Sequence, residues 1–306
     1  MRFPWAHTFS IVARDPQTGQ LGVAVQSHWF SVGSVVSWAE AGVGAVATQA
    51  LVDVRYGPLG LALMRAGYSA PQALAALLAA DDGRDLRQVA MVDAQGRVAV
   101  HTGPRCIPEA GHETGDGFSV QANMMLGPEV WPAMARAYRT SSGDLAQRLL
   151  AALEAGQAAG GDIRGQQSAC ILIVAPVSTG RPWADTVMDL RVEDHPQPIA
   201  ELRRLVELHR AYRHMNQGDE WLGKGEVERA LEEYRAADRT VPDHEEIRFW
   251  HAVTLADAGR LEEALPLFRE VFARNPLWAT LLERLETVGL VGYDPETLRR
   301  ILSFSE

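Results

Sequence analysis

The sequence predicts a mixed α+β protein: a four-layer αββα sandwich over residues 1–195, followed by an all-α helical domain over residues 196–306. Three observations lead to this prediction. Short strand-like runs are followed by two helical patterns, and this order then repeats and ends in strands. Such an order can be built as two stacked antiparallel sheets with helices on both outer faces, although an ordinary α+β layer fold remains the alternative. After His195-Pro196 the composition changes to Arg-, Glu- and Leu-rich helix.

The elements of the first domain follow from local patterns in chain order. A β-hairpin is expected from Thr8 to Ser27, because two apolar runs flank the turn Asp15-Pro16-Gln17-Thr18-Gly19-Gln20. Pro58 and Pro71 stand where two helices between Tyr56 and Ala80 would begin. The remaining expected strands are 34–38, 44–48, 89–92, 98–101, 117–123, 168–176 and 184–191, the last two as neighbours, and the remaining helices are 129–138 and 144–158.

The second domain contains a repeat with a period of 34 residues. Gly225, Ala230, Tyr234 and Pro242 recur as Gly259, Ala264, Phe268 and Pro276. Small residues that let paired helices approach, with an aromatic residue filling the gap, are typical of tetratricopeptide repeats. We therefore expect a short tetratricopeptide-like array whose groove binds a peptide or a protein partner. The alternative is that the first domain or a second copy of the chain covers this groove.

Composition excludes several classes of function. The net charge of −10 offers no basic surface for nucleic acid or an anionic membrane. Cys106 and Cys170 form no CxxC pair, and no signal-peptide core or membrane span is present, so a cytoplasmic protein is expected. Lys224 is the sole lysine, which excludes a pyridoxal Schiff base, a P-loop lysine and a proteasome-type catalytic lysine.

The start of the hairpin carries the most informative chemistry. A Thr or Ser at the head of a first strand is where an N-terminal-nucleophile hydrolase keeps its catalytic group, and this chain has Thr8 and Ser10 there. Such an enzyme uses the α-amino group of the nucleophile as its base. Because seven residues precede Thr8, that amine must first be released by cleavage. The alternative is that Thr8 is simply a strand residue.

Residues 8 to about 191 resemble a bacterial and archaeal family catalogued as a domain of unknown function, number ten-twenty-eight. The resemblance implies the N-terminal-nucleophile hydrolase fold, with Thr8 at the nucleophile position, and implies fold more firmly than a particular reaction. It is carried by residues 8–15, 42–49, 105–107 with 110–112, 115–117 leading to 123–124, and 161–162 with 164–169.

Asn123 is the second candidate catalytic residue. It is the only asparagine before residue 216, and its amide could donate to a developing oxyanion or satisfy local backbone instead. Arg164 could bind a substrate carboxylate or hold Asp162 in a structural pair. Asp53 and Arg55 pose the same question, and Asp53 could also sit near a helix N-terminus. The predicted substrate-binding residues are Ser10, Gln49, Asp53, Arg55, His112, Asp116, Asp162, Arg164 and Gln167.

No metal site and no cofactor are expected. His101, His112 and Asp116 lie among Pro and Gly residues, where no helix can align them as ligands. Gly42-x-Gly44-x-x-Ala47 is followed by a strand pattern, which argues against a dinucleotide. Two functional hypotheses remain: an amidohydrolase acting on a small amide, modified amino acid or peptide fragment, or a catalytically silent module that recruits a partner through its repeats. A homodimer is expected in either case.

Overall fold

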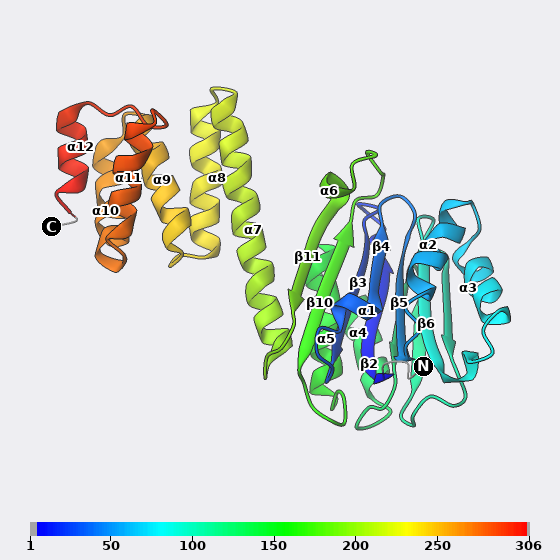
Figure 1. Cartoon of the computed structure of the whole chain (residues 1–306). Helices are drawn as coiled ribbons and strands as arrows, with labels where there is room; N and C mark the ends of the chain where they lie inside the picture. Colours follow the sequence, from blue (N-terminus) through cyan, green and yellow to red (C-terminus); the bar gives the residue numbers. More distant parts are fainter. Residues whose placement is uncertain (1–4, 305–306) are drawn as a thin grey trace. The chain divides into compact units, whose positions relative to one another are not determined.

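The computed structural model describes residues 5–304, with side chains from His7 to Phe304. The chain divides into two compact units, Met1–Leu205 and Val206–Glu306, and the division falls within helix α7 (Pro198–Gly223). Figure 1 shows both units and labels most of their elements. The first unit is mixed α+β, and the second is entirely helical over its described residues.

Two antiparallel sheets form the first unit. Sheet A has the order β1-β5-β6-β7, and β4 pairs with β5 as well. Sheet B has the order β11-β10-β3-β2-β9-β8. Sheet A comprises β1 (Trp5–Ala6), β4 (Ser37–Glu40), β5 (Gly44–Leu51), β6 (Arg87–Asp93) and β7 (Val98–Thr102); sheet B comprises β2 (Thr8–Arg14), β3 (Leu21–Ser27), β8 (Gly111–Gly115), β9 (Phe118–Ala122), β10 (Ser168–Val174) and β11 (Thr186–Val192).

The sheets face each other across an apolar core. Val12, Val23, Ala47 and Val92 belong to one buried cluster that draws on both sheets. Because successive side chains of a strand point to opposite faces, the alternate residues pack against helices. Helices α2 (Tyr56–Arg65) and α3 (Ala70–Ala79) cover sheet A, and α4 (Val130–Thr140) and α5 (Leu145–Ala158) cover sheet B.

Local sequence signals explain the helix starts. Ser69 accepts a hydrogen bond from the backbone of Gln72, whose side chain accepts from the Ser69 backbone. This capping box begins α3 at Ala70, directly before Pro71. Asp144 and Gln147 form the same motif at α5. Three short helices complete the unit: α1 (Gly33–Val36), the 3-10 helix Arg84–Leu86 and α6 (Pro182–Asp185).

One predicted strand is wrong and two strands, β1 and β8, were missed. Residues 34–38 were expected to be extended, but Gly33–Val36 forms a helical turn and β4 starts only at Ser37. The turn is stabilised because the Ser34 hydroxyl donates to the Ser31 carbonyl at 2.7 Å. A short apolar run does not reveal its own conformation. The sequence Gly-His-Glu-Thr-Gly of β8 has no apolar alternation, so nothing predicted that strand. The hairpin β2–β3 and the pairing of β10 with β11 are confirmed.

The second unit places corresponding residues of the 34-residue repeat in corresponding positions. Gly225 and Gly259 both have positive φ, at +75° and +74°, where α7 and α9 end. Ala230 and Tyr234 are buried in α8, as Ala264 and Phe268 are in α10. The helices are α7, α8 (Val227–Thr240), α9 (Glu245–Asp257), α10 (Leu261–Arg274), α11 (Leu277–Thr287) and α12 (Pro295–Leu302). None of the helices between Trp5 and Phe304 is both long and apolar enough to cross a membrane.

Candidate functional site

Polar side chains collect between the sheets at the end where β2 begins. Val12 packs in the core between the sheets. Thr8 and Ser10 alternate with it along β2 and so point to the same face, towards sheet A. Ser10 lies opposite Gln121 in β9, and the backbone N–H of Asn123 donates to the Thr8 carbonyl at 3.1 Å. Six of these polar residues are completely buried: Thr8, Ser10, Gln49, Gln88, Gln121 and Asn123.

Gln88 holds the centre of this region. Its Nε2 faces three oxygens, the Thr102 hydroxyl at 2.9 Å and the carbonyls of Gly111 and Ala122 at 3.2 and 2.8 Å. Two of these oxygens are carbonyls, which can only accept, so the amide nitrogen must face them and the orientation of the Gln88 amide is fixed. Its Oε1 therefore accepts from Gln49 Nε2 at 2.6 Å and from Asn123 Nδ2 at 2.9 Å.

This orientation determines the role of His7. With Asn123 Nδ2 directed at Gln88, Asn123 Oδ1 faces His7 Nδ1 at 2.8 Å and must accept a hydrogen bond from its N–H. Burial lowers the pKa of His7, and the positive charge of Arg164 adds to this, although the Asn123 contact and Asp162 act the other way. His7 is therefore a neutral imidazole at neutral pH, with its proton on Nδ1.

The carbonyl of His7 is held by two donors. Ser27 Oγ donates to it at 2.6 Å and Arg164 Nη2 at 2.9 Å. Arg164 is itself fixed by Asp162, which accepts from Nε at 3.1 Å and from Nη2 at 2.7 Å. The peptide carbonyl directly before Thr8 thus lies between a hydroxyl and a guanidinium, as in a site that stabilises negative charge on oxygen.

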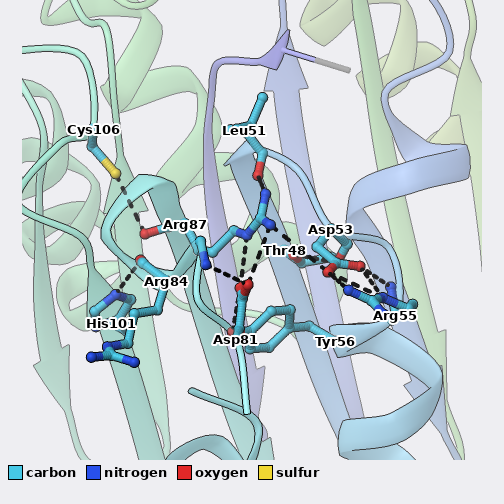
Figure 2. Close-up of polar contacts among 11 residues, drawn as sticks. Thr48, Leu51, Asp53, Arg55, Tyr56, Asp81, Arg84, Arg87, His101 and Cys106 are labelled. Carbon is cyan, nitrogen blue, oxygen red and sulfur yellow. Dashed lines mark hydrogen bonds and ion pairs between the residues drawn. The ribbon is translucent and has the colours of Figure 1, made fainter. Parts of the chain in front are cut away.

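A second polar cluster lies at the C-terminal end of β5, on the face of sheet A that α2 and α3 cover (Figure 2). Arg87, whose side chain is 4% exposed, donates to Asp81 at 2.8 Å and to the Leu51 carbonyl at 2.6 Å. Arg55 forms a bidentate pair with Asp53, and its hydrogen bond is the main reason why the pKa of Asp53 is lowered. Tyr56 donates to Asp81 at 3.0 Å. We call the side chains of Asp53, Arg55, Tyr56, Asp81 and Arg87 the acid–arginine cluster.

Four members of the acid–arginine cluster, all but Arg87, line a pocket of only about 90 Å³. Burial opposes ionisation of Asp81, but the hydrogen bonds from Arg87, the Gly83 backbone and Tyr56 outweigh it, and the pKa of Asp81 is lowered. Two carboxylates and two guanidiniums balance in charge. Such a cluster anchors the end of β5 to the helices and offers no unpaired group for a ligand.

Comparison with known proteins identifies the family. Residues 8–202 match the family of unknown function DUF1028. The chain belongs to this family. Among solved structures it is similar to protein SPO2555 from Silicibacter pomeroyi, a DUF1028 protein, at 32% sequence identity and a TM-score of 0.60. That similarity covers 66% of this chain and 88% of the other. A comparison with curated proteins finds no match.

Within the DUF1028 region, five predicted residues meet around the His7–Thr8 peptide: Thr8, Gln49, Asn123, Asp162 and Arg164. Ser10 adjoins them, donating to Gln49 Oε1 and accepting from Gln121 Nε2, both at 2.6 Å. His112 lies at the edge of the same network, where its Nδ1 contacts the Thr102 hydroxyl at 2.9 Å. Burial, with a smaller contribution from His101, lowers the pKa of His112.

Four predicted residues lie elsewhere in the DUF1028 region. Asp53 and Arg55 belong to the acid–arginine cluster, because the chain turns towards α2 after β5. Asp116 lies in the β8–β9 turn next to Phe118, which pairs with Ala13, and this puts it about 17 Å along β2 from Thr8. Gln167 donates to Asp194 at 3.1 Å, towards the end of β11.

Sequence reasoning missed His7, Ser27, Gln88 and Gln121. One signal was available: Gln88 and Gln121 are polar residues next to apolar runs that form buried strands, and such residues need buried partners. Among residues 5–304, no group of three or more His, Cys, Asp or Glu side chains is placed to hold a metal ion.

Proposed function

We propose that the DUF1028 region of this chain is an N-terminal-nucleophile-type amidohydrolase with Thr8 as its nucleophile, and that its sheets and helices form the four-layer αββα sandwich of that class. The main observation that supports this proposal concerns the His7 carbonyl, which accepts hydrogen bonds from Ser27 Oγ at 2.6 Å and from Arg164 Nη2 at 2.9 Å. Two further observations support the proposal. Thr8 begins β2 in the interior of sheet B, and the family match starts at Thr8 itself.

The first reaction is cleavage of the chain before Thr8. Thr8 Oγ attacks the His7 carbonyl carbon, the hydroxyl proton passes to the Thr8 nitrogen, and the carbon–nitrogen bond breaks to leave an ester on Oγ. Water then hydrolyses this ester, giving a carboxylate on His7 and a free hydroxyl and amine on Thr8. Ser27 and Arg164 stabilise the oxyanion of both steps, and one such donor contributes about 3–4 kcal/mol to the barrier.

The second reaction is hydrolysis of a substrate amide in the same place. The freed α-amine has an ordinary pKa of about 7.7–8.0, so it can take the proton from Thr8 Oγ near neutral pH. The substrate carbonyl occupies the position that His7 leaves, between Ser27 and Arg164. Asn123 keeps both its Nδ2 contacts, with Gln88 Oε1 and the Thr8 carbonyl, and so positions the strand end rather than supplying the oxyanion donor predicted for it. The reaction needs no cofactor.

Intact-mass spectrometry of the purified protein tests the first reaction. We expect the wild-type chain to begin at Thr8. Thr8→Ala should remain uncleaved, whereas Thr8→Ser keeps a hydroxyl and should be cleaved as the wild type is. Arg164→Ala should slow cleavage about 100-fold or more. If the wild-type protein and Thr8→Ser both retain residues 1–7 after prolonged incubation, Thr8 is not a nucleophile of this class.

A retained N-terminus would favour the second candidate, a module that binds a partner through its helices. The observation in its favour is the equivalent placement of Ala230 and Ala264, and of Tyr234 and Phe268, in α8 and α10. We infer from this that α7–α10 are tetratricopeptide-like. Such arrays carry peptide-binding grooves, and intact mass therefore separates the two candidates before any ligand is known.

A further inference from the structure

The N-terminal segment forms a strand on the edge of sheet A next to Thr8. β4 pairs with the first half of β5, from Gly44 to Ala47, and leaves the end of β5 unpaired on that side. β1 fills this place: Trp5 pairs with Leu51 and Ala6 with Ala50, both antiparallel. The chain then crosses through His7 from sheet A to the start of β2 in sheet B.

This crossing fixes how the segment meets Thr8. The backbone approaches as an extended strand, and its next carbonyl, that of His7, is held by Ser27 and Arg164. The segment therefore lies as the acyl side of a peptide substrate would lie. Its removal leaves the backbone groups of Ala50 and Leu51 without their strand partner, and an unpaired sheet edge binds extended peptides by adding a strand.

We infer that the edge of β5 at Ala50–Leu51 is a substrate subsite, and that the substrate of the mature protein is an extended peptide with at least three residues on the acyl side of the scissile bond. This inference rests on the proposed function, because the same site must first lose residues 1–7. The carbonyl of the third residue takes the His7 position, and the two residues before it pair with β5. Amides of single amino acids lack this pairing and are poor substrates.

The test measures binding without turnover. A shortened chain that starts at residue 8 and carries Thr8→Ala is released from a cleavable N-terminal fusion. It is then titrated with the peptide Met1–His7, which carries a C-terminal amide. Circular dichroism and the thermal midpoint show that the shortened chain is folded. We expect binding at least tenfold tighter than to full-length Thr8→Ala, in which β1 still occupies the edge. Equal affinity for both proteins would place the peptide elsewhere and overturn the inference.

N-methylated peptides test strand pairing directly. In an antiparallel pair only alternate residues exchange both backbone hydrogen bonds. N-methylation at one of the positions Trp5 and Ala6 should therefore weaken binding about tenfold, and N-methylation at the other should leave binding nearly unchanged. If both methylated peptides bind like the parent, no strand is added to β5.

If the shortened chain with Thr8 intact hydrolyses single-residue amides but does not bind the peptide, the proposed function stands and the peptide subsite is wrong.

A second measurement uses only the full-length chain. In the Thr8→Ala background, Trp5→Pro and Ala6→Pro each remove one backbone donor of β1. At least one of them should speed hydrogen exchange in residues 49–52 about tenfold. Unchanged exchange in both variants would show that β1 does not pair with β5, whether or not Thr8 is a nucleophile.

Discussion

At the scale of single residues, Gln88 connects the two sheets. Its amide contacts Gln49 in sheet A, Asn123 at the end of β9, and two carbonyls of sheet B. Gln49, Asn123 and Ala122 are completely buried, so the loss of the Gln88 side chain leaves several buried donors and acceptors unpaired at once. Buried polar groups without partners are costly in proportion to their number.

We therefore expect Gln88→Ala to lower the free energy of unfolding by about 3 kcal/mol or more, measured by urea denaturation. Gln17→Ala is the matched control, because Gln17 lies in the exposed β2–β3 turn, and it should change stability by less than about 0.5 kcal/mol. Equal effects of the two substitutions would mean that the network contributes nothing to folding.

The same network shows what a sequence can and cannot predict at this scale. Thr8 was placed correctly at the head of its strand, because alternation and the Asp15–Gln20 turn define the hairpin locally. Which residues of sheet A meet Thr8 depends on how the sheets stack, and no local pattern encodes that. Gln49 and Gln88 are 39 residues apart and become neighbours only through the β5–β6 pairing.

At the scale of elements, helix starts were more predictable than strand identities. Ser69 and Asp144 cap α3 and α5 through hydrogen bonds to residues three positions later, which a sequence displays. The turn Gly33–Val36 depends instead on a tertiary contact. A Cβ at Gly33 would lie 2.6 Å from the Cβ of Cys170 in β10, so the turn packs tightly on a strand more than 130 residues away.

The packing of α2 on sheet A gives a prediction at the same scale. A Cβ at Gly57 would lie 2.3–2.4 Å from three atoms of the Trp38 indole ring, which is anchored by its hydrogen bond to the Val35 carbonyl. A Cβ at Gly60 would meet the end of the Met91 side chain at 2.7 Å. Met is flexible and can move aside, whereas a pinned indole cannot.

Alanine is favoured over glycine inside a helix by about 1 kcal/mol, so steric overlap must exceed this gain to destabilise the protein. We expect Gly57→Ala to lower the free energy of unfolding by about 1–3 kcal/mol, and Gly60→Ala to change it by less than about 1 kcal/mol. Thermal denaturation of both variants checks this. A Gly57→Ala protein as stable as Gly60→Ala would show that the Trp38 ring moves freely.

At the scale of the whole molecule, the two units differ in how their buried titratable groups are held. In the first unit Asp53 and Asp81 are held in ion pairs with arginines, and their lowered pKa values mean that their contribution to stability is lost only below about pH 4. Each unit also buries an imidazole, but His7 of the first unit contacts Asn123, whereas His251 of the helical unit has no such contact. His251 is 6% exposed, neither of its ring nitrogens has a hydrogen-bond partner, and the ring is stacked on Tyr234 at 6.1 Å.

This difference predicts that mild acid loosens the helical unit through His251. Burial lowers the pKa of His251, although Asp238 and Glu263 oppose this and Arg235 and Arg260 reinforce it. A base whose pKa is lower in the folded state takes up a proton more readily when unfolded. Its neutral form thus supports the fold fully above about pH 6.5, and this support declines as the pH falls towards the lower folded pKa.

Hydrogen exchange of α8–α10 in the full-length protein measures the effect. Each variant is compared with wild type at pH 7.5 and at pH 5.5, so that the intrinsic pH dependence of exchange cancels. His251→Phe keeps a ring against Tyr234 but cannot be protonated, so its α8–α10 protection should fall less than that of wild type on acidification. His214→Gln changes a ring that is 44% exposed and should keep the wild-type response. If His251→Phe loses as much protection as wild type between the two pH values, protonation of His251 does not limit the stability of this unit.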